Sequence, residues 1–140
     1  MIIRRLDIDL VRYVAHSLAA RSMSGDEPIP PFETRYPDIL ESCVNTPFQK
    51  FDRKNLYKNL QSQAAILFYL LIKNHPFQNG NKRIAVTTLL VFLSLNKKWL
   101  RVDTKELYNF AVWVAQSPPK LKKSVLEAIE DFININLVKF

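Results

Sequence analysis

The sequence predicts an all-α fold, a compact single-domain bundle of helices with a possible small β-hairpin flap before the central helices. Only two glycines occur in 140 residues, Gly25 and Gly80, so the chain has little material for the tight turns of a large sheet. Apolar residues recur at helical spacing along several stretches. One stretch, Ile84 to Leu95, is apolar almost all round, which is typical of a helix at the centre of a bundle. A chain of this length can bury a substantial core, and we expect one domain over residues 1–140.

The first part of the chain is predicted to begin with a helix and then become irregular. A helix is expected over residues 5–20, where the apolar residues at helical spacing are Leu6, Leu10, Val14 and Leu18. The stretch from Ser22 to Pro37 is rich in proline and acidic residues, which indicates a loop. A short helix is predicted over residues 38–44. Residues 46–54 are polar and irregular and favour an exposed flap, and a hairpin is expected near residues 28–52.

The remainder of the chain is predicted to be mostly helical. A helix over residues 55–74 ends before Pro76, and its shared apolar face consists of Leu56, Leu60, Ala64, Leu67 and Leu71. The central helix follows over residues 81–97. Asp103 or Thr104 is expected to cap a helix that ends at Gln116. Ser117 and Pro118 resemble an N-cap and a proline at the first helical position, and they predict a last helix to about Asn136.

The positive charge of the chain is concentrated in one region. The formal net charge is +7, and residues 53–102 contain nine lysines and arginines but no aspartate or glutamate. A field of one sign around a small cleft attracts anions, such as nucleotide phosphates or an acidic partner. The basic region lacks the aromatic-studded stripe that is typical of nucleic-acid binding, so no direct nucleic-acid partner is expected.

The sequence favours a cytoplasmic protein with no membrane partner. Its single cysteine, Cys43, cannot form an internal disulfide and is expected to be a partly buried structural thiol. Asp7 and Asp9 interrupt the N-terminus, so no signal-peptide segment forms there. The longest apolar run, residues 64–72, is much shorter than the roughly 20 residues that span a bilayer.

Nine consecutive residues, from His75 to Arg83, carry the chemistry of the chain. The sequence of this run is His-Pro-Phe-Gln-Asn-Gly-Asn-Lys-Arg, and a buried helix is expected to begin inside it. Backbone amides at the start of a helix lack intrahelical partners and bind phosphate readily. Arg83 can grip phosphate oxygens with two hydrogen bonds, while Lys82 adds a point charge and the amide of Asn81 can donate to an oxygen.

The same run places a candidate base beside this anion site. Surrounding cations should favour the neutral imidazole of His75, which can accept a proton from an attacking hydroxyl. Lysine and arginine in the first turn of a helix oppose the helix dipole, so Lys82 and Arg83 call for a compensating anion. These parts together suit phosphoryl or nucleotidyl transfer, in which positioning and charge stabilisation do most of the catalysis.

The run resembles the signature of the Fic/Doc (Fido) family, a His-x-Phe loop followed by an acidic residue, Gly or Ala, Asn, Gly or Lys, and Arg. The matching residues are His75, Phe77, Gly80, Asn81, Lys82 and Arg83. Lys82 and the following Ile84-Ala85 look like the Doc (death-on-curing) branch of the family. The resemblance is expected to extend from about Pro37 to Gln116.

The resemblance implies a role for each matching residue. His75 would deprotonate a target hydroxyl, Phe77 would anchor the loop in the core, and residues 79–83 would hold the nucleotide phosphates. A flap near residues 35–50 would align the target peptide by strand-like contacts. Val86 stands where the Fic branch carries a second arginine, and this difference favours a Doc-like reaction.

In that reaction the terminal phosphate of ATP is transferred to a Ser or Thr hydroxyl of a cytoplasmic protein such as a translation elongation factor. The resemblance further implies a toxin that is neutralised by a Phd-type antitoxin. Two alternatives stay open. The first is an AMP-transferase (AMPylator) that modifies protein hydroxyls. The second is a catalytically degenerate Fido domain that binds a nucleotide or a partner without turnover.

The second alternative arises from Asn79, which occupies the position of the family's acidic metal ligand. Mg²⁺ prefers oxygen ligands and commonly uses one or two carboxylates together with substrate phosphates. Asn79 offers a neutral carbonyl only, so Mg²⁺ would be held weakly, or the cations of the loop would replace it, or activity would be impaired. The inhibitory Ser/Thr-x-x-x-Glu-Gly/Asn pattern of some Fic proteins is absent from the sequence. This absence leaves room for an inhibitor that acts in trans.

Other conspicuous residues are expected to be structural. His16 is predicted to be a surface or boundary histidine. Three aromatic residues are predicted to belong to the core, and they are Trp99, Phe110 and Trp113. Lys120, Lys122 and Lys123 are expected to form a solvated face that could meet an acidic antitoxin segment.

Overall fold

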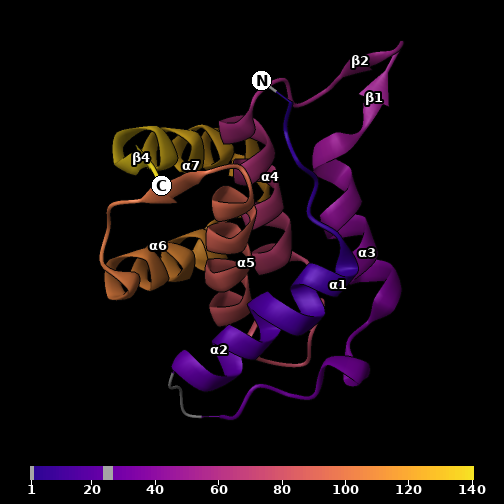
Figure 1. Ribbon diagram of the computed structural model, residues 1–140, viewed down its shortest axis with the longest axis vertical. Coiled ribbons are helices and arrows are strands. Elements are labelled where there is room, and N and C mark those ends of the chain that lie inside the picture. Colours follow the sequence, from indigo (N-terminus) through magenta and orange to yellow (C-terminus); the bar gives the residue numbers. More distant parts are fainter. Residues whose placement is uncertain (1, 24–26) are drawn as a thin grey trace.

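A computed structural model describes residues 2–23 and 27–140, and it is an all-α fold, as predicted (Figure 1). The first helix runs without interruption through α1 (Ile8–Leu10), a π-helical stretch (Val11–Ala15) and α2 (His16–Ser22). Asp7 begins this helix, because its side chain accepts a hydrogen bond from the Leu10 amide and so satisfies one of the unpaired amides of the first turn.

Two antiparallel helices form the centre of the molecule. They are α4 (Leu60–Lys73) and α5 (Asn81–Leu95), and they pack along each other (Figure 1). Asn59 starts α4 with a reciprocal capping box, in which its side chain accepts from the Ser62 amide while Ser62 Oγ accepts from the Asn59 amide. Both helices are buried on nearly every side, so the loop between them is held at both ends by the core.

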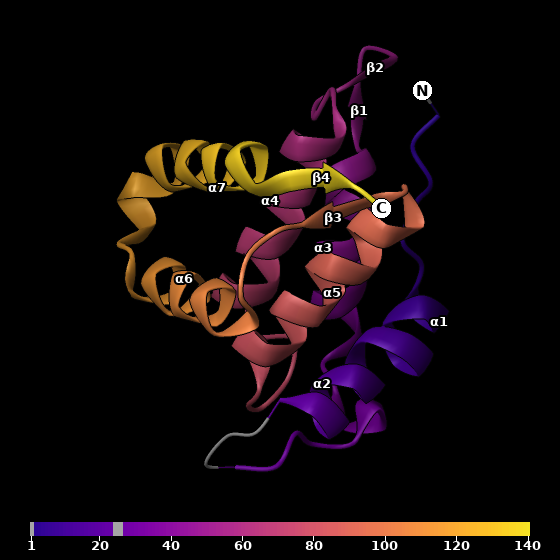
Figure 2. The same cartoon turned by 60° about the vertical axis from the view of Figure 1, so that its left-hand side comes forward.

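The other helices enclose this central pair from two sides. The first helix and α3 (Pro37–Asn45) lie on one side, and α6 (Thr104–Gln116) and α7 (Lys122–Asn136) lie on the other (Figures 1 and 2). Short 3₁₀ turns occupy Phe32–Thr34, Thr46–Phe48 and Pro119–Leu121. No helix in the described ranges is long and apolar enough to cross a membrane.

Two small antiparallel strand pairs complete the fold. β1 (Lys50–Phe51) pairs with β2 (Lys54–Asn55), with Lys50 opposite Asn55. β3 (Lys98–Leu100) pairs with β4 (Leu137–Lys139), with Trp99 opposite Val138, and this second pair was not predicted. The predicted hairpin lies before the central helices, as expected, but it is confined to residues 50–55 rather than spread over residues 28–52.

Several predicted boundaries were wrong. The helix expected from Asn55 begins at Leu60, because residues 54–55 pair as a strand and leave the Leu56 side chain 53% exposed. The last helix begins at Lys122 rather than directly after Pro118, since a 3₁₀ turn intervenes. The expected loop from Ser22 to Pro37 includes residues 24–26, which lie outside the described residues.

Burial also corrects four expectations for single side chains. Trp99 and Trp113 are 37% and 48% exposed, so they lie at the surface rather than in the core. His16 was expected at the surface or its boundary, but it is buried and packs against two phenylalanines, Phe32 and Phe77. Cys43 is fully rather than partly buried, and this burial raises the pKa of its thiol to about 12, so the thiol stays protonated at neutral pH.

Candidate active site

The loop between α4 and α5 is bounded by two residues in left-handed backbone conformation. His75 follows the C-cap Asn74 and has φ 50°, while Gly80 precedes α5 and has φ 76°. Histidine tolerates this conformation better than most residues other than glycine, but the geometry remains costly and is held only where surrounding contacts enforce it. The two left-handed turns make the chain reverse tightly between the antiparallel helices.

The side chain of Asn81 holds this loop in shape. Its Oδ1 accepts a hydrogen bond from the Phe77 amide at 2.9 Å, and its Nδ2 donates to the Phe77 carbonyl at 2.8 Å. The side-chain amide of Asn81 can be oriented in only one way, because the backbone N–H of Phe77 can only donate and must therefore face Oδ1. Asn81 was predicted to contact phosphate with its side chain, whereas the structure uses that side chain inside the loop and leaves the backbone amide of Asn81 for an anion.

The imidazole of His75 is exposed at the start of the loop, where a substrate hydroxyl can reach it. Its Nδ1 lies 3.4 Å from Asn81 Nδ2, at the long end of the hydrogen-bond range. When Asn81 donates to Nδ1, the neutral ring carries its hydrogen on Nε2. For Nε2 to accept a proton, the neutral ring must instead carry its hydrogen on Nδ1. This tautomer loses only the long contact with Asn81 Nδ2.

Phe77 anchors the loop in the hydrophobic core. Its side chain is 1% exposed and lies with its ring centroid 5.6 Å from that of His16 and 6.0 Å from that of Phe32. His16 also makes a 2.8 Å hydrogen bond through Nε2 to the carbonyl oxygen of Pro30. His16 is therefore a supporting residue of the loop that sequence reasoning missed, because nothing local in the first helix indicates its contact with Phe77.

The two cations of the motif lie in the first turn of α5. Arg83 is 8% exposed, and its Nη2 donates to the carbonyl oxygen of Glu27 at 2.8 Å. Lys82 is partly exposed. The first amide of α5 with an acceptor inside the helix is that of Ile84, which bonds to Gly80 O at 2.9 Å. The preceding amides are the ones that a phosphate would use.

The segment from Glu27 to Pro31 passes over this helix start. A Cβ placed on Gly80 would lie 2.9 Å from Ile29 Cγ1, which is closer than side chains tolerate. Gly80 is therefore required twice, by its positive φ and by the close approach of Ile29. The Glu27 carbonyl and the Ile29 side chain therefore lie directly against the start of α5.

Asn79 provides a single neutral oxygen at this site. Its Oδ1 is buried and has no hydrogen-bond partner among the described residues. Residues 2–23 and 27–140 contain no cluster of three or more His, Cys, Asp or Glu side chains that could hold a metal ion. One carbonyl oxygen is a poor match for the multiple oxygen ligands of Mg²⁺, so the described side chains do not fit a resident Mg²⁺ site and no step is derived through one.

The expected flap is only partly in place. Residues 37–45 form a helix, α3, and the hairpin at residues 50–55 lies at the opposite end of α4 from the motif loop (Figures 1 and 2). Among the described residues, the expected flap makes a strand-like contact to the loop through Tyr36, whose amide donates to Pro76 O at 2.9 Å. A cavity of about 410 Å³ lies beside the start of α3 and is lined by Asp38, Ile39, Ser42 and Asn74, the last being the residue before His75.

This geometry defines a class of protein: a helical bundle whose central turn places an exposed histidine before a helix start with unpaired amides and two cations. A sequence model of the Fic/DOC family matches residues 5–93, which is more than half of the chain, and the chain belongs to that family. No curated protein matches the chain, and no solved structure matches it. Family members typically transfer nucleotide-derived groups to proteins.

The matched region differs from the one predicted. The resemblance was expected from about Pro37 to Gln116, whereas the match begins before the first helix and ends within α5. The structure gives a physical reason for the earlier start. The first helix carries His16 against Phe77 and accepts a hydrogen bond from Thr87 at Ala15 O, so it belongs to the support of the motif loop.

Proposed function

We propose that the protein is a Doc-like toxin that transfers the terminal phosphate of ATP to a Ser or Thr hydroxyl of a cytoplasmic protein, with a translation elongation factor as the candidate target. The observation that carries the proposal is the exposed imidazole of His75 beside the first turn of α5, where free amides and two cations converge. A Phd-type antitoxin is the proposed inhibitor. ATP is the proposed phosphate donor.

The proposed reaction is a direct displacement at the terminal phosphorus. The target hydroxyl gives its proton to the unprotonated nitrogen of His75 while its oxygen bonds to phosphorus. The bond from phosphorus to the bridging oxygen breaks, and ADP leaves with that oxygen. The amides of residues 80–83 and the side chains of Lys82 and Arg83 would stabilise the charge on the phosphate oxygens.

The position of Val86 supports phosphate transfer over AMP transfer. In the Fic branch an arginine at this place helps to orient the nucleotide for AMP transfer. Here the residue is Val86, which is fully buried in the core and supplies no donor. AMP transfer is the second proposed activity, and the neutral Asn79 motivates a third, nucleotide or partner binding without turnover.

Labelled ATP distinguishes the three activities. The purified chain is incubated with a cell lysate and ATP labelled either at the terminal or at the innermost phosphate. Terminal label on a protein supports phosphate transfer, and innermost label supports AMP transfer. Retained ATP binding with neither label on protein supports a binding module.

Two variants test the residue assignments. His75→Ala should reduce transfer by about 10²–10⁴-fold, the usual contribution of a general base. Gln78→Ala, an exposed neighbour in the same loop, is the matched control and should transfer normally. Equal activity of the two variants would refute the role of His75. Asn79→Asp should raise activity if the missing carboxylate limits metal binding.

A further inference from the structure

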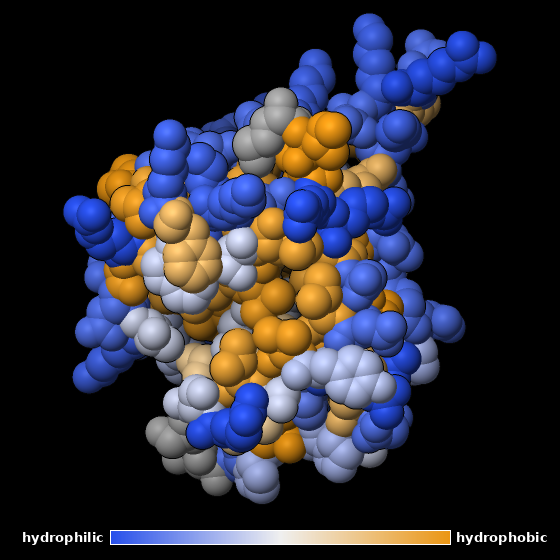
Figure 3. Space-filling view, viewed as in Figure 1, coloured by the Kyte–Doolittle hydropathy of each residue, from blue (hydrophilic) through white to orange (hydrophobic). Residues whose placement is uncertain are grey.

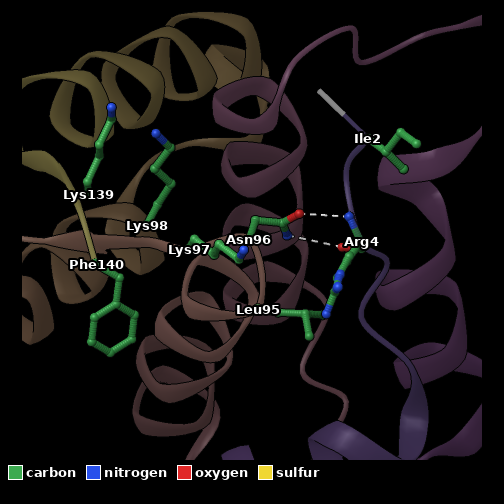
Figure 4. A pocket seen from close by; sticks show the side chains of 8 residues that line it. All are labelled: Ile2, Arg4, Leu95, Asn96, Lys97, Lys98, Lys139 and Phe140. Atoms are coloured by element: carbon green, nitrogen blue, oxygen red, sulfur yellow. Dashed lines mark hydrogen bonds between the residues drawn. The ribbon is translucent and has the colours of Figure 1, made fainter.

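A basic cavity of about 640 Å³ lies at the C-terminal end of α5, at the opposite end of that helix from the motif loop. A second cavity, of about 350 Å³, meets the first at Lys98 and adds Lys58. No aspartate or glutamate side chain lines either cavity, and the two ion pairs found in the described part of the chain involve other residues. The cations that line the larger cavity are Arg4, Lys97, Lys98 and Lys139 (Figure 4).

This basic surface is assembled from distant parts of the chain. Lys98 lies directly opposite Lys139 in the β3–β4 pair, which places both side chains on one face of the strand pair. Arg4 is held across the cavity, because Asn96 Oδ1 accepts from its amide at 2.7 Å and Asn96 Nδ2 donates to its carbonyl oxygen at 3.1 Å (Figure 4). The helix dipole accounts for lysines that directly follow α5, but not for Arg4 and Lys139, which come from outside that helix.

The β1–β2 hairpin extends the basic surface beyond Lys58. It projects from the body of the molecule, and Figure 3 shows it covered mainly by hydrophilic residues. Arg53 lies at its tip with φ 66°, and Lys97 follows the C-cap of α5 with φ 61°. Glycine is preferred at both of these positions, and a longer side chain there costs stability. Two cations kept in strained conformations beside one basic surface indicate that their charge is used.

Exposed aromatic rings flank these cations. Phe140 lines the larger cavity and is 76% exposed, and its ring centroid lies 5.3 Å from that of Trp99. Its amide donates to Lys97 O at 3.0 Å, which fixes the C-terminal strand beside the lysines. No nucleic-acid partner was expected, since residues 53–102 by themselves lack a stripe of cations and aromatic rings. The fold completes such a stripe by bringing Lys139 and Phe140 next to this region.

We propose that this surface binds single-stranded nucleic acid, with phosphates on the cations of the larger cavity and bases stacked on Trp99 and Phe140. Aromatic rings within a basic surface provide both contacts that a single strand needs. A duplex is disfavoured because its bases are already stacked, and an acidic peptide segment would match the cations but not the rings. The surface lies about 22 Å from the motif loop, the length of α5, so it is separate from the site of the proposed transfer reaction.

The probes are fluorescein-labelled oligouridylate and oligodeoxythymidylate of about 12 nucleotides. The comparison probes are an RNA duplex of the same length and a polyglutamate peptide of the same charge. At about 0.05 M salt, fluorescence anisotropy should show at least about tenfold tighter binding of the single strands. The tighter of the two single strands identifies the source as RNA or DNA. Absent binding, or equal or tighter binding of the duplex or of polyglutamate, overturns the proposal.

Charge variants test the phosphate contacts. Lys98→Gln and Lys139→Gln should each weaken oligonucleotide binding. Each should also reduce the slope of log affinity against log salt concentration by about 0.7, the value for one phosphate contact on a single strand. Lys120→Gln is the matched control, because it removes the same charge at an exposed position outside both cavities. An equal reduction of the slope in the Lys120→Gln variant contradicts the proposed location.

Ring variants test the stacking contacts. Phe140→Leu should weaken oligonucleotide binding about tenfold, whereas Phe140→Tyr retains the ring and should bind normally. In a Trp113→Phe background, Trp99 is the only tryptophan, and the oligonucleotide should quench its emission while polyglutamate should not. Equal binding by the two Phe140 variants, or unchanged emission at saturating oligonucleotide, contradicts base stacking at this place.

Three further variants test the strained cations and the independence of the two sites. Lys97→Gly and Arg53→Gly should raise the midpoint of thermal unfolding and yet weaken oligonucleotide binding, since each relieves strain and removes a cation. Normal binding by both variants contradicts the proposal. His75→Ala should bind oligonucleotide normally, and Lys98→Gln should retain transfer activity. A failure of the proposed transfer reaction is therefore distinguishable from a failure of nucleic-acid binding.

Discussion

The two ends of α5 have similar hydrogen-bonding frameworks, but the helix dipole gives them partial charges of opposite sign. At the N-terminal end, Asn81 bonds both the amide and the carbonyl of Phe77. At the C-terminal end, Asn96 bonds both the amide and the carbonyl of Arg4. Each end also has a residue in left-handed conformation, Gly80 with φ 76° and Lys97 with φ 61°.

Each end also carries two adjacent cations, and here the physics differs. Lys97 and Lys98 follow the C-terminus of α5, where the helix dipole favours positive charge. Lys82 and Arg83 lie in its first turn, where the dipole opposes positive charge and no acidic residue is present. The fold alone thus explains the charge of the C-terminal pair, whereas the anionic ligand of the proposed function would explain the N-terminal pair.

Replacing the two asparagines by alanine should give the largest difference between the ends. Asn81→Ala and Asn96→Ala each leave backbone groups unpaired, so each should lower the free energy of unfolding by about 1–3 kcal/mol. Asn81→Ala should also reduce phosphate or AMP transfer about a hundredfold, because the loop that positions His75 loosens. Urea unfolding and the transfer assay check this prediction. Equal losses of transfer in both variants, measured on folded protein, would contradict it.

Substituting the residue in left-handed conformation at each end should change the free energy of unfolding by a smaller amount, and in opposite directions at the two ends. Gly80→Ala should lower the free energy of unfolding by about 1–2 kcal/mol, since its Cβ meets Ile29 and its φ is positive. Lys97→Gly should raise it by up to about 1 kcal/mol, because glycine is the preferred residue after a helix. Thermal unfolding measures both. A stabilised Gly80→Ala variant would mean that the loop relaxes away from Ile29.

Removing one cation at each end should give the smallest effect and the sharpest test. In buffer without phosphate or sulfate, Lys82→Gln should raise the free energy of unfolding by about 0.3–1 kcal/mol, and Lys98→Gln should lower it by a similar or smaller amount. Both changes should shrink at about 0.5 M salt. Addition of ATP should reverse the sign for Lys82→Gln alone. If both variants changed the free energy of unfolding in the same direction, the electrostatic argument for an anionic ligand at the N-terminal end would fail.

The elements nearest the motif were predictable because their signals are local. The central helix was predicted to start at Asn81, and it does, since the glycine before it and the apolar run after it are adjacent in sequence. The helix expected from Asp103 or Thr104 begins at Thr104 with Asp103 as its cap. Leu56 was wrongly assigned to the apolar face of a helix, because the apolar residues continue at helical spacing by chance beyond the start of α4 toward the strand pair that ends at Asn55.

The support of the candidate site was not predictable, because it is made by distant segments. His16, Phe32 and Ile29 reach the loop from a region of the sequence that carries no motif. Trp99 was expected in the core from its size and hydrophobicity, yet the pairing of β3 with β4 places it at the surface. Sequence pattern gives the face of an element that is apolar, but not the partner that covers it.

The sequence by itself determined that the chain is all-α, that it belongs to the Fic/DOC family, and that a basic turn joins the two central helices. These features follow from the spacing of neighbouring residues. Only the tertiary structure decided that Asn81 serves the loop, that Ile29 covers Gly80, and that the pairing of β3 with β4 places Trp99 at the surface. Each of these depends on which distant segments meet, and local spacing does not encode that choice.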